Sequence, residues 1–153
     1  MKDNYFNFDE QPVDQQISPK LKKICKTWTG KWRYNGNERF MTVLIGYVYD
    51  GGSIPRFVWS ILGITPSGPG DGGFLPHDVL YRAMGGKKPD AYLGCTVLDE
   101  NGEAVQLSRK EADWVLGEGM KFGGIAKHRV ALAIPFVRMF GKKHWGGPIP
   151  SIR

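Results

Sequence analysis

Hydrophobic and polar residues alternate in the first third of the chain in the manner of paired β-strands. The segments 28–34 and 40–49 are rich in aromatic and β-branched residues, and Asn35-Gly36-Asn37 lies between them. An Asn-Gly turn between two such segments is typical of a β-hairpin. A second hairpin is predicted for 92–98 and 103–107, because a run of Asp, Glu, Asn and Gly separates these segments.

Helical signals dominate the second half of the chain. Pro76 suits the first turn of a helix over 77–84, and Gly85-Gly86 is a good signal for its end. Two further helices are predicted over 108–122 and 126–140. Together with the hairpins, these helices predict an α+β fold.

Capping and breaking residues refine these helices. Ser108 and Glu111 form the pattern of a capping box at the start of the second long helix. Pro135 predicts a kink or a local break in the last helix. A short helical turn, capped by Ser53, is expected through 58–62.

We expect the chain to consist of an N-terminal arm, one folded domain and a C-terminal tail. Residues 1–19 are polar and without clear periodicity, which predicts an N-terminal arm that only a partner orders. Residues 20–145 form a single α+β domain, and 146–153 form an extended tail.

Composition limits the class of protein. The chain has 153 residues with 21 Gly and 10 Pro, which argues against a helical bundle or a coiled coil. Cys25 and Cys95 are most simply interpreted as reduced thiols, with a single disulfide as the alternative. No apolar run approaches the length of a membrane span, and the N-terminus lacks the apolar region of a secretory signal. The chain is therefore expected in the cytoplasm of the cell that makes it, and a virus particle assembled there would also fit.

Positive charge is concentrated at the C-terminal end. The net charge is +6, and seven Lys and Arg residues but no Asp or Glu occur from Lys121 onward. Such a stretch is either a solvated surface or a contact for an anionic partner, such as lipid headgroups or nucleic acid. A nucleic-acid binding module is the weaker hypothesis, because no recognised motif accompanies the charge.

Four residues form a candidate chemical site. Asp50 ends a strand, His77 and Asp78 open a helix, and Asp113 lies one turn into another helix. An imidazole oriented by a carboxylate can act as a general base, and carboxylates can hold a hard cation such as calcium. The structural alternative is that Asp50 caps its turn and that His77 and Asp78 bond loop amides. Asp113 would then pair with one of three arginines, namely Arg56, Arg82 or Arg109.

Three sequence blocks carry a resemblance: DGGSIPR from Asp50, PHDVLYRA from Pro76, and RKEADWVL from Arg109. They resemble a family of uncharacterised proteins of tailed bacteriophages and prophages. The same blocks resemble the bacterial and fungal secreted phospholipase A2 enzymes, which implies a phospholipase-like helical core for the fold. The chain departs from those enzymes at Gly52 and Leu75, where they have cysteines that anchor the loop to the helix.

The phospholipase resemblance also implies residue roles. His77 would be the general base, Asp113 its orienting partner, and Tyr81 a support for Asp113. The carboxylates of Asp50 and Asp78 would bind Ca²⁺, together with backbone oxygens near Gly51.

Two functions follow as expectations. The first is a phage protein, associated with the virion or tail, that hydrolyses esters of bacterial phospholipid with calcium. The second is a non-catalytic component of the phage tail or tail tip, in which the same residues form a structural network. The expected partners are other virion proteins and an anionic bacterial membrane surface, and the chain is expected to be made in the host cytoplasm.

Overall fold

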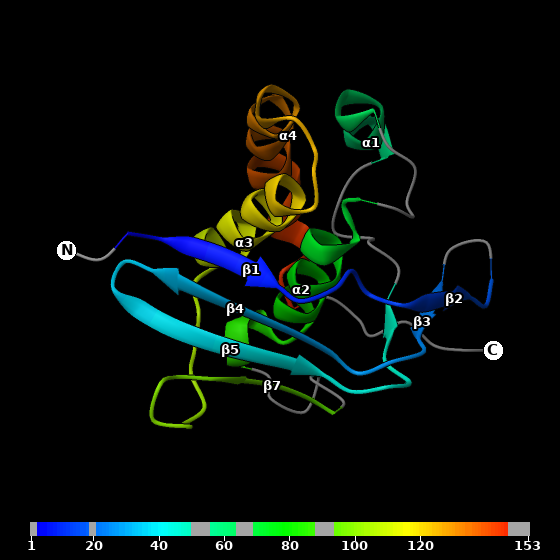
Figure 1. The fold of residues 1–153 in the computed structure, drawn as a ribbon. Coiled ribbons are helices and arrows are strands. Elements are labelled where there is room, and N and C mark those ends of the chain that lie inside the picture. The colour runs from blue at the N-terminus through cyan, green and yellow to red at the C-terminus, as the bar shows by residue number, and fades with distance from the viewer. Residues whose placement is uncertain (1–2, 19–20, 50–55, 64–68, 88–93, 147–153) are drawn as a thin grey trace.

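A computed structural model describes residues 3–18, 21–49, 56–63, 69–87 and 94–146. In this part of the chain, antiparallel strands and α-helices form separate layers, so the predicted α+β fold is confirmed. Figure 1 shows the helices gathered on one face of the larger sheet.

The larger sheet has four antiparallel strands in the order β1-β4-β5-β7. Its centre is the predicted first hairpin, in which Tyr34 pairs with Asn37 at the end next to the turn. Asn35 and Gly36 have φ values of 50° and 82° there, which is the left-handed geometry of a tight hairpin turn. The strands are β1 (Tyr5–Phe8), β4 (Trp28–Tyr34), β5 (Asn37–Val43) and β7 (Cys95–Leu98).

A smaller sheet in the order β2-β3-β6 lies beside it. The continuous strand expected over 40–49 is divided, because Gly46 adopts a φ of 96° and turns the chain after β5. Its last part then pairs with β3 instead of extending the hairpin. The strands are β2 (Asp14–Gln16), β3 (Lys22–Ile24) and β6 (Val48–Tyr49).

The expectation that residues 1–19 need a partner to become ordered is wrong for the described part of that segment. Tyr5–Phe8 forms β1 and pairs with β4. Phe6 and Phe8 belong to the buried core, and the Phe6 ring stacks on Trp32 with centroids 5.8 Å apart. Two aromatic residues at alternate positions bury enough apolar surface to fix the strand.

The second predicted hairpin is also incomplete. β7 pairs with β5, but the returning segment makes only an isolated bridge between Leu98 and Ala104. The predicted turn is present, because Asp99 Oδ1 accepts hydrogen bonds from the backbone N–H groups of Asn101 (2.8 Å) and Glu103 (2.9 Å). The turn therefore forms as predicted, but the residues after it do not form the second strand of the hairpin. In the described sheet β7 pairs with β5 instead.

Four α-helices and two short 3₁₀ helices are present in the described residues. Ser108 caps α3 as predicted, because its Oγ accepts a hydrogen bond from the Glu111 N–H at 3.1 Å. The Glu111 side chain instead accepts from the Trp32 indole at 2.9 Å. The helices are α1 (Arg56–Leu62), α2 (Asp71–Arg82), η1 (Met84–Gly86), α3 (Arg109–Phe122), α4 (Lys127–Phe140) and η3 (Gly141–His144).

Helix α2 begins earlier than predicted. The sequence placed its first turn at Pro76, but the helix starts at Asp71 and contains Pro76. Glycine is a poor helix former, so Gly72 and Gly73 gave no helical signal. Packing against α3 places them in the helix. A Cβ on Gly73 would lie 2.6 Å from the Leu116 carbonyl oxygen, so the two backbones approach where a larger residue has no room.

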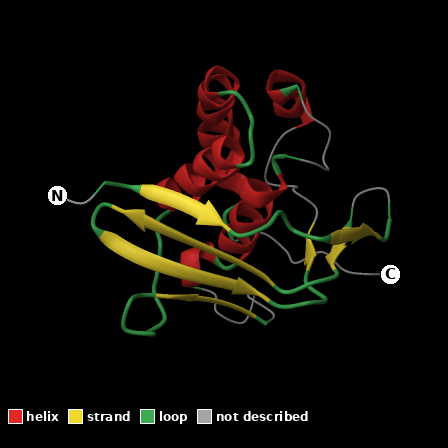
Figure 2. Cartoon of the chain, in the orientation of Figure 1, coloured by secondary structure: helices red, strands yellow, loops and turns green. Residues whose placement is uncertain are grey.

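Two hydrophobic clusters lie on either side of α2 and α3. The first fills the space between the large sheet and these helices, and the second joins them to α4, with α1 residues packed on its edge. Figure 2 shows the resulting arrangement, with α4 and α1 standing away from the sheet. No helix of the described residues is long and apolar enough to cross a membrane. Cys25 and Cys95 are both free thiols, as the simplest interpretation of the sequence predicted.

Candidate functional site

Helices α2 and α3 bring His77, Tyr81 and Asp113 together. His77 and Tyr81 are four residues apart in α2 and therefore lie on the same face of that helix. The Nε2 atom of His77 is 3.0 Å from Oδ1 of Asp113, and the Tyr81 hydroxyl donates to the same oxygen at 2.5 Å. One carboxylate oxygen of α3 thus joins two side chains of α2.

Two arginines complete this cluster, which we call the Asp113 network. Arg138 Nη1 in α4 is 2.8 Å from the second oxygen of Asp113, Oδ2. Arg109 Nε donates to the Tyr81 hydroxyl at 3.1 Å, and its Nη2 donates to the carbonyls of Val137 (3.3 Å) and Arg138. The network therefore connects α2, α3 and α4.

The centre of the network is excluded from solvent. His77 is 0% exposed and Asp113 is 1% exposed. The rings of His77 and Tyr81 have centroids 4.2 Å apart, and the rings of Tyr81 and Trp145 are perpendicular, with centroids 5.1 Å apart. Gly141 lies against the other side of Tyr81, where a Cβ would be 2.9 Å from the hydroxyl oxygen. Residues that follow α4 therefore close the site around Tyr81.

Burial determines the protonation of His77. Removal from water lowers the pKa of His77 from its usual 6.5, although the hydrogen bond and the negative charge of Asp113 act in the opposite direction. At neutral pH the imidazole is therefore neutral. Because the ionised Asp113 can only accept a hydrogen bond, the neutral ring carries its hydrogen on Nε2, which donates to Asp113, and its lone pair is on Nδ1.

Asp113 remains ionised beside the neutral ring. Burial acts to raise the pKa of Asp113, but hydrogen bonds from His77, Tyr81 and Arg138 outweigh it and lower the pKa below 3.8. The pKa of Tyr81 is raised, mainly by burial, so its hydroxyl stays a donor. A carboxylate that fixes one nitrogen of a neutral imidazole is an arrangement suited to general-base chemistry.

Asp78, the next residue in α2, belongs to a separate cluster that we call the Asp78 network. Arg82 Nη2 is 2.8 Å from Oδ2 of Asp78, one helical turn away. Arg82 Nη1 also donates to the Tyr47 hydroxyl at 3.0 Å and to the Val48 carbonyl at 2.5 Å. Asp78 and Arg82 are both buried. This network joins α2 to β6.

The predicted calcium ligands do not come together in the described residues. Asp50 and Gly51 lie outside the part of the chain that the structure describes. The carboxylate of Asp78 is already in an ion pair with Arg82. Among the described residues, no group of three or more His, Cys, Asp or Glu side chains could hold a metal ion. The described residues therefore do not fit a calcium site, and calcium binding stays a prediction.

The arginine that pairs with Asp113 is not one of the three that the structural alternative predicted from the sequence. That alternative named Arg56, Arg82 or Arg109; the side chain of Arg56 is not described, and the described partner is Arg138. Arg82 pairs with Asp78 instead, because both lie on one face of α2. Arg109, which precedes Asp113 by four residues in α3, joins the network through the Tyr81 hydroxyl instead. Arg138 gave no signal in the sequence, because only the packing of α4 brings it close.

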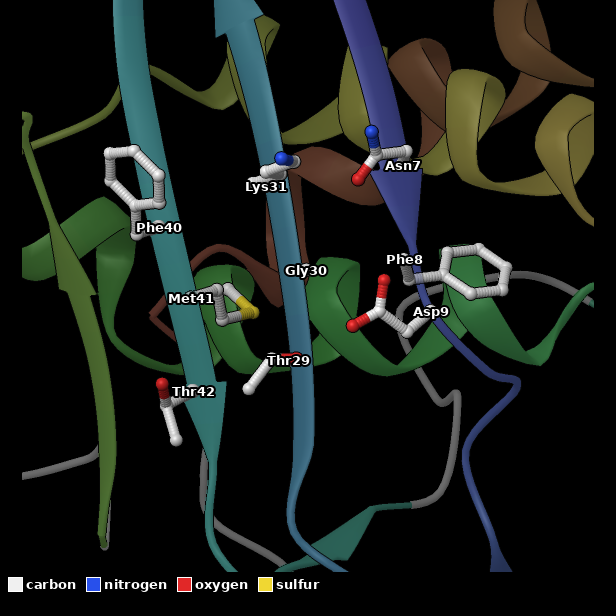
Figure 3. A pocket seen from close by; sticks show the side chains of 9 residues that line it. All are labelled: Asn7, Phe8, Asp9, Thr29, Gly30, Lys31, Phe40, Met41 and Thr42. Atoms are coloured by element: carbon white, nitrogen blue, oxygen red, sulfur yellow. The ribbon is translucent and has the colours of Figure 1, made fainter.

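A hollow of about 280 Å³ occupies the opposite face of the large sheet (Figure 3). Gly30 and Met41 lie at its centre, and Asn7, Lys31 and Phe40 stand around it. Helix α2 lies behind the strands in this view, so the sheet separates the hollow from the Asp113 network. None of the predicted site residues lines it.

Comparison with known proteins gives a family but no characterised relative. No curated protein and no solved structure matches the chain. One family model, described as "Protein of unknown function (DUF1353)", matches residues 27–134. The match covers most of the chain, from the first strand of the central hairpin to α4, and includes His77 and Asp113. The chain is therefore a member of the DUF1353 family.

Proposed function

We propose that the chain is a bacteriophage protein, associated with the tail or virion, whose Asp113 network hydrolyses ester bonds of bacterial phospholipid. The single observation that carries the hydrolytic part is the 3.0 Å contact between His77 Nε2 and Asp113 Oδ1. The three sequence blocks that resemble phage proteins and secreted phospholipase A2 support the setting and the substrate class.

In the proposed reaction, His77 activates water. Nδ1 of the neutral ring takes a proton from the water as its oxygen forms a bond to the ester carbonyl carbon. When the resulting tetrahedral species collapses, its bond to the alkoxide oxygen breaks, and the imidazolium returns the proton to that oxygen. The products are a fatty acid and a lysophospholipid. Proton transfer of this kind contributes roughly 10²- to 10⁴-fold in rate.

The other members of the network support His77. Asp113 holds the Nε2 proton and stabilises the positive charge that the ring carries during the reaction. Tyr81 fixes Asp113 Oδ1, and Arg109 fixes the Tyr81 hydroxyl. Tyr81, Arg109 and Arg138 are thus positioning residues. No step is assigned to calcium, because the described residues do not fit a site for it.

A second candidate function is a non-catalytic component of the phage tail or tail tip. The complete burial of His77, at 0% exposure, favours it. In that case both networks only join elements of the fold, as the ion pair of Asp78 with Arg82 does between α2 and β6.

The test is the release of fatty acid from a short-chain phosphatidylglycerol that dissolves as monomers. The full chain is assayed with added calcium and with EDTA, beside His77→Gln and the matched control His128→Gln, an exposed histidine of α4. We expect His77→Gln to lose at least about 100-fold in rate and the control to keep the wild-type rate.

Two results contradict the hydrolytic proposal. If the wild-type chain releases no fatty acid with calcium or with EDTA, the second candidate stands. If His77→Gln and the wild-type chain release it equally, the activity does not come from this site. A rate that EDTA abolishes and calcium restores would revive the predicted metal site.

A further inference from the structure

Helix α4 is apolar on two opposite faces. One face packs on the second hydrophobic cluster through Val130, Ala133 and Val137. The other face is open to solvent, where Leu132 is 59% exposed and Met139 is 68% exposed. A helix that only covers a core is polar on its outer face. The second apolar face therefore needs another explanation. Its side chains follow helical spacing and are Leu132, Pro135, Phe136, Met139 and Phe140.

Helix α1 extends this face. Phe57 meets the rings of Phe136 and Phe140 edge-on, at 5.4 Å and 5.6 Å between centroids. Phe57 is itself exposed. Figure 1 shows α1 and α4 side by side, projecting from the rest of the molecule. We call Phe57 and the five α4 residues the α1–α4 face. Along α4 it is about 12 Å long, from the rise of 1.5 Å per residue.

Positive charge surrounds the α1–α4 face. Arg129 lies at the N-terminal end of the α4 stripe, and Lys142 and Lys143 follow its C-terminal end. Neither α1 nor α4 contains an acidic residue. Two copies of this chain that met through their α4 faces would therefore bring like charges together. The charge instead fits an anionic partner.

The side chains of α4 also distinguish between kinds of anionic partner. The helix contains no Ser, Thr, Asn, Gln, Asp or Glu, only apolar and basic residues. A protein interface usually carries about one hydrogen bond per 100–200 Å² and has a polar rim. A bilayer needs no such hydrogen bonds. It accepts apolar side chains below its headgroups while Lys and Arg remain among the phosphates.

We propose that the α1–α4 face docks on an anionic lipid bilayer. This inference rests on the proposed function, because it names the surface through which the protein would reach its lipid. Leu132, Met139 and Phe140 insert below the headgroups. The lysine side chains that follow the C-terminal end of the stripe contact phosphate, at about 1 kcal/mol per basic residue near the surface.

The test is co-sedimentation of the full chain with vesicles, in the His77→Gln background so that no lipid is consumed. One set of vesicles contains phosphatidylglycerol and phosphatidylethanolamine, and the other contains phosphatidylcholine alone. The test variant is the double substitution Leu132→Ser with Met139→Ser. The matched control is Leu44→Ser with Ile45→Ser, which removes two exposed apolar side chains beside the large sheet.

We expect binding to the anionic vesicles that weakens with salt, and much weaker binding to phosphatidylcholine. The α4 double variant should bind the anionic vesicles at least about tenfold more weakly, while the control binds like its parent. Substitution of Lys142 and Lys143 by Glu should lower binding to anionic vesicles without changing the binding to phosphatidylcholine.

Other results overturn the inference. Absence of vesicle binding overturns it, and so does equal binding by the α4 variant and the control. Self-association that the α4 variant abolishes would assign the face to a second copy of the chain. Hydrolysis of the monomeric substrate without vesicle binding contradicts only this inference. Vesicle binding without hydrolysis contradicts only the proposed function.

Discussion

Asp113 and Asp78 are two buried carboxylates beside helix α2 that are neutralised in different ways. Asp78 pairs with Arg82 in its own helix, and both side chains are about 5% exposed or less. Asp113 has partners from α2 and α4, and its arginine, Arg138, is 41% exposed. A compact ion pair needs only one helix, whereas the Asp113 network needs three helices to be in place.

The chemistry of the two networks differs as well. The Asp78 network joins a carboxylate, a guanidinium and a phenol hydroxyl, and it contains no imidazole. The Asp113 network contains His77, which burial holds neutral, beside an ionised carboxylate. This difference fits our proposal that the Asp113 network supplies a general base, whereas the Asp78 network joins elements of the fold. The following predictions test that division.

The largest expected effect is the loss of folding stability when the arginine partners of the two carboxylates, Arg82 and Arg138, are replaced. Arg82→Met leaves the Asp78 carboxylate buried without its ion pair, which should cost about 3–5 kcal/mol in the free energy of unfolding. Arg138→Met should cost about 1 kcal/mol, because this side chain is 41% exposed and Asp113 keeps two other donors. Urea unfolding of the two variants checks the difference, and equal losses would contradict the division.

A smaller loss is expected where α2 meets α3. A Cβ on Gly119 would lie 2.6 Å from Gly73 Cα, so Gly119→Ala should force the helices apart and cost about 2–3 kcal/mol. Gly117→Ala is the matched control in the same helix. Its Cβ would meet only side-chain atoms of Ile134 and Val130, at 3.3–3.4 Å. The gain in helix propensity, about 1 kcal/mol, should offset that crowding.

The Gly119→Ala variant should also affect the two networks differently. Of the two networks, only the Asp113 network crosses from α2 to α3, so the contacts of His77 and Tyr81 with Asp113 should lengthen while the ion pair within α2 should not. NMR titration of His77 in Gly119→Ala reports this change, and the Gly117→Ala protein serves as its reference. An unchanged His77 titration in a destabilised Gly119→Ala protein would show that the network does not depend on the spacing of the helices.

The two tyrosines allow a comparison between the networks at the level of single hydroxyl groups. Tyr81→Phe removes a donor to Asp113 and the acceptor for Arg109, so it should cost about 2 kcal/mol. Tyr47→Phe removes one of the acceptors of Arg82, which keeps the Val48 carbonyl and Asp78, and it should cost about 1 kcal/mol. Thermal unfolding measures both, and a larger cost for Tyr47→Phe would reverse the assignment.

The sequence predicted the parts of the fold that short-range signals determine. The Asn-Gly turn identified the β4–β5 hairpin, and Ser108 identified the start of α3. His77 and Tyr81 could be placed on one helical face because they are four residues apart. The pairing of His77 with Asp113 was a hypothesis from the chemistry of the two groups, and the link from Tyr81 to Asp113 came only from the phospholipase resemblance, since 32 and 36 residues separate Asp113 from them.

Long-range packing decided the features that the sequence did not predict. Phe6 and Phe8 make β1 part of the sheet, although the segment around them is polar. Gly72 and Gly73 enter α2 because α3 packs against them. Arg138 reaches Asp113 only after α4 has packed on α3. In each case the signal was a contact between distant residues, which a single sequence does not display.

The smallest predicted effect is the pH dependence of stability that His77 contributes. The pKa of His77 is lowered in the folded protein, so below pH 6.5 the unfolded chain binds a proton that the folded protein excludes. Stability should therefore fall as the pH decreases through 6.5, by at most about 0.8 kcal/mol between pH 7.5 and 6.0 for one site. Urea unfolding of the wild-type chain and of His77→Gln at both pH values isolates this contribution. The variant should lose less stability on acidification than the wild-type chain. If both lose the same amount, the imidazole is not held neutral by burial, and the Asp113 network would lack the base that distinguishes it from the Asp78 network.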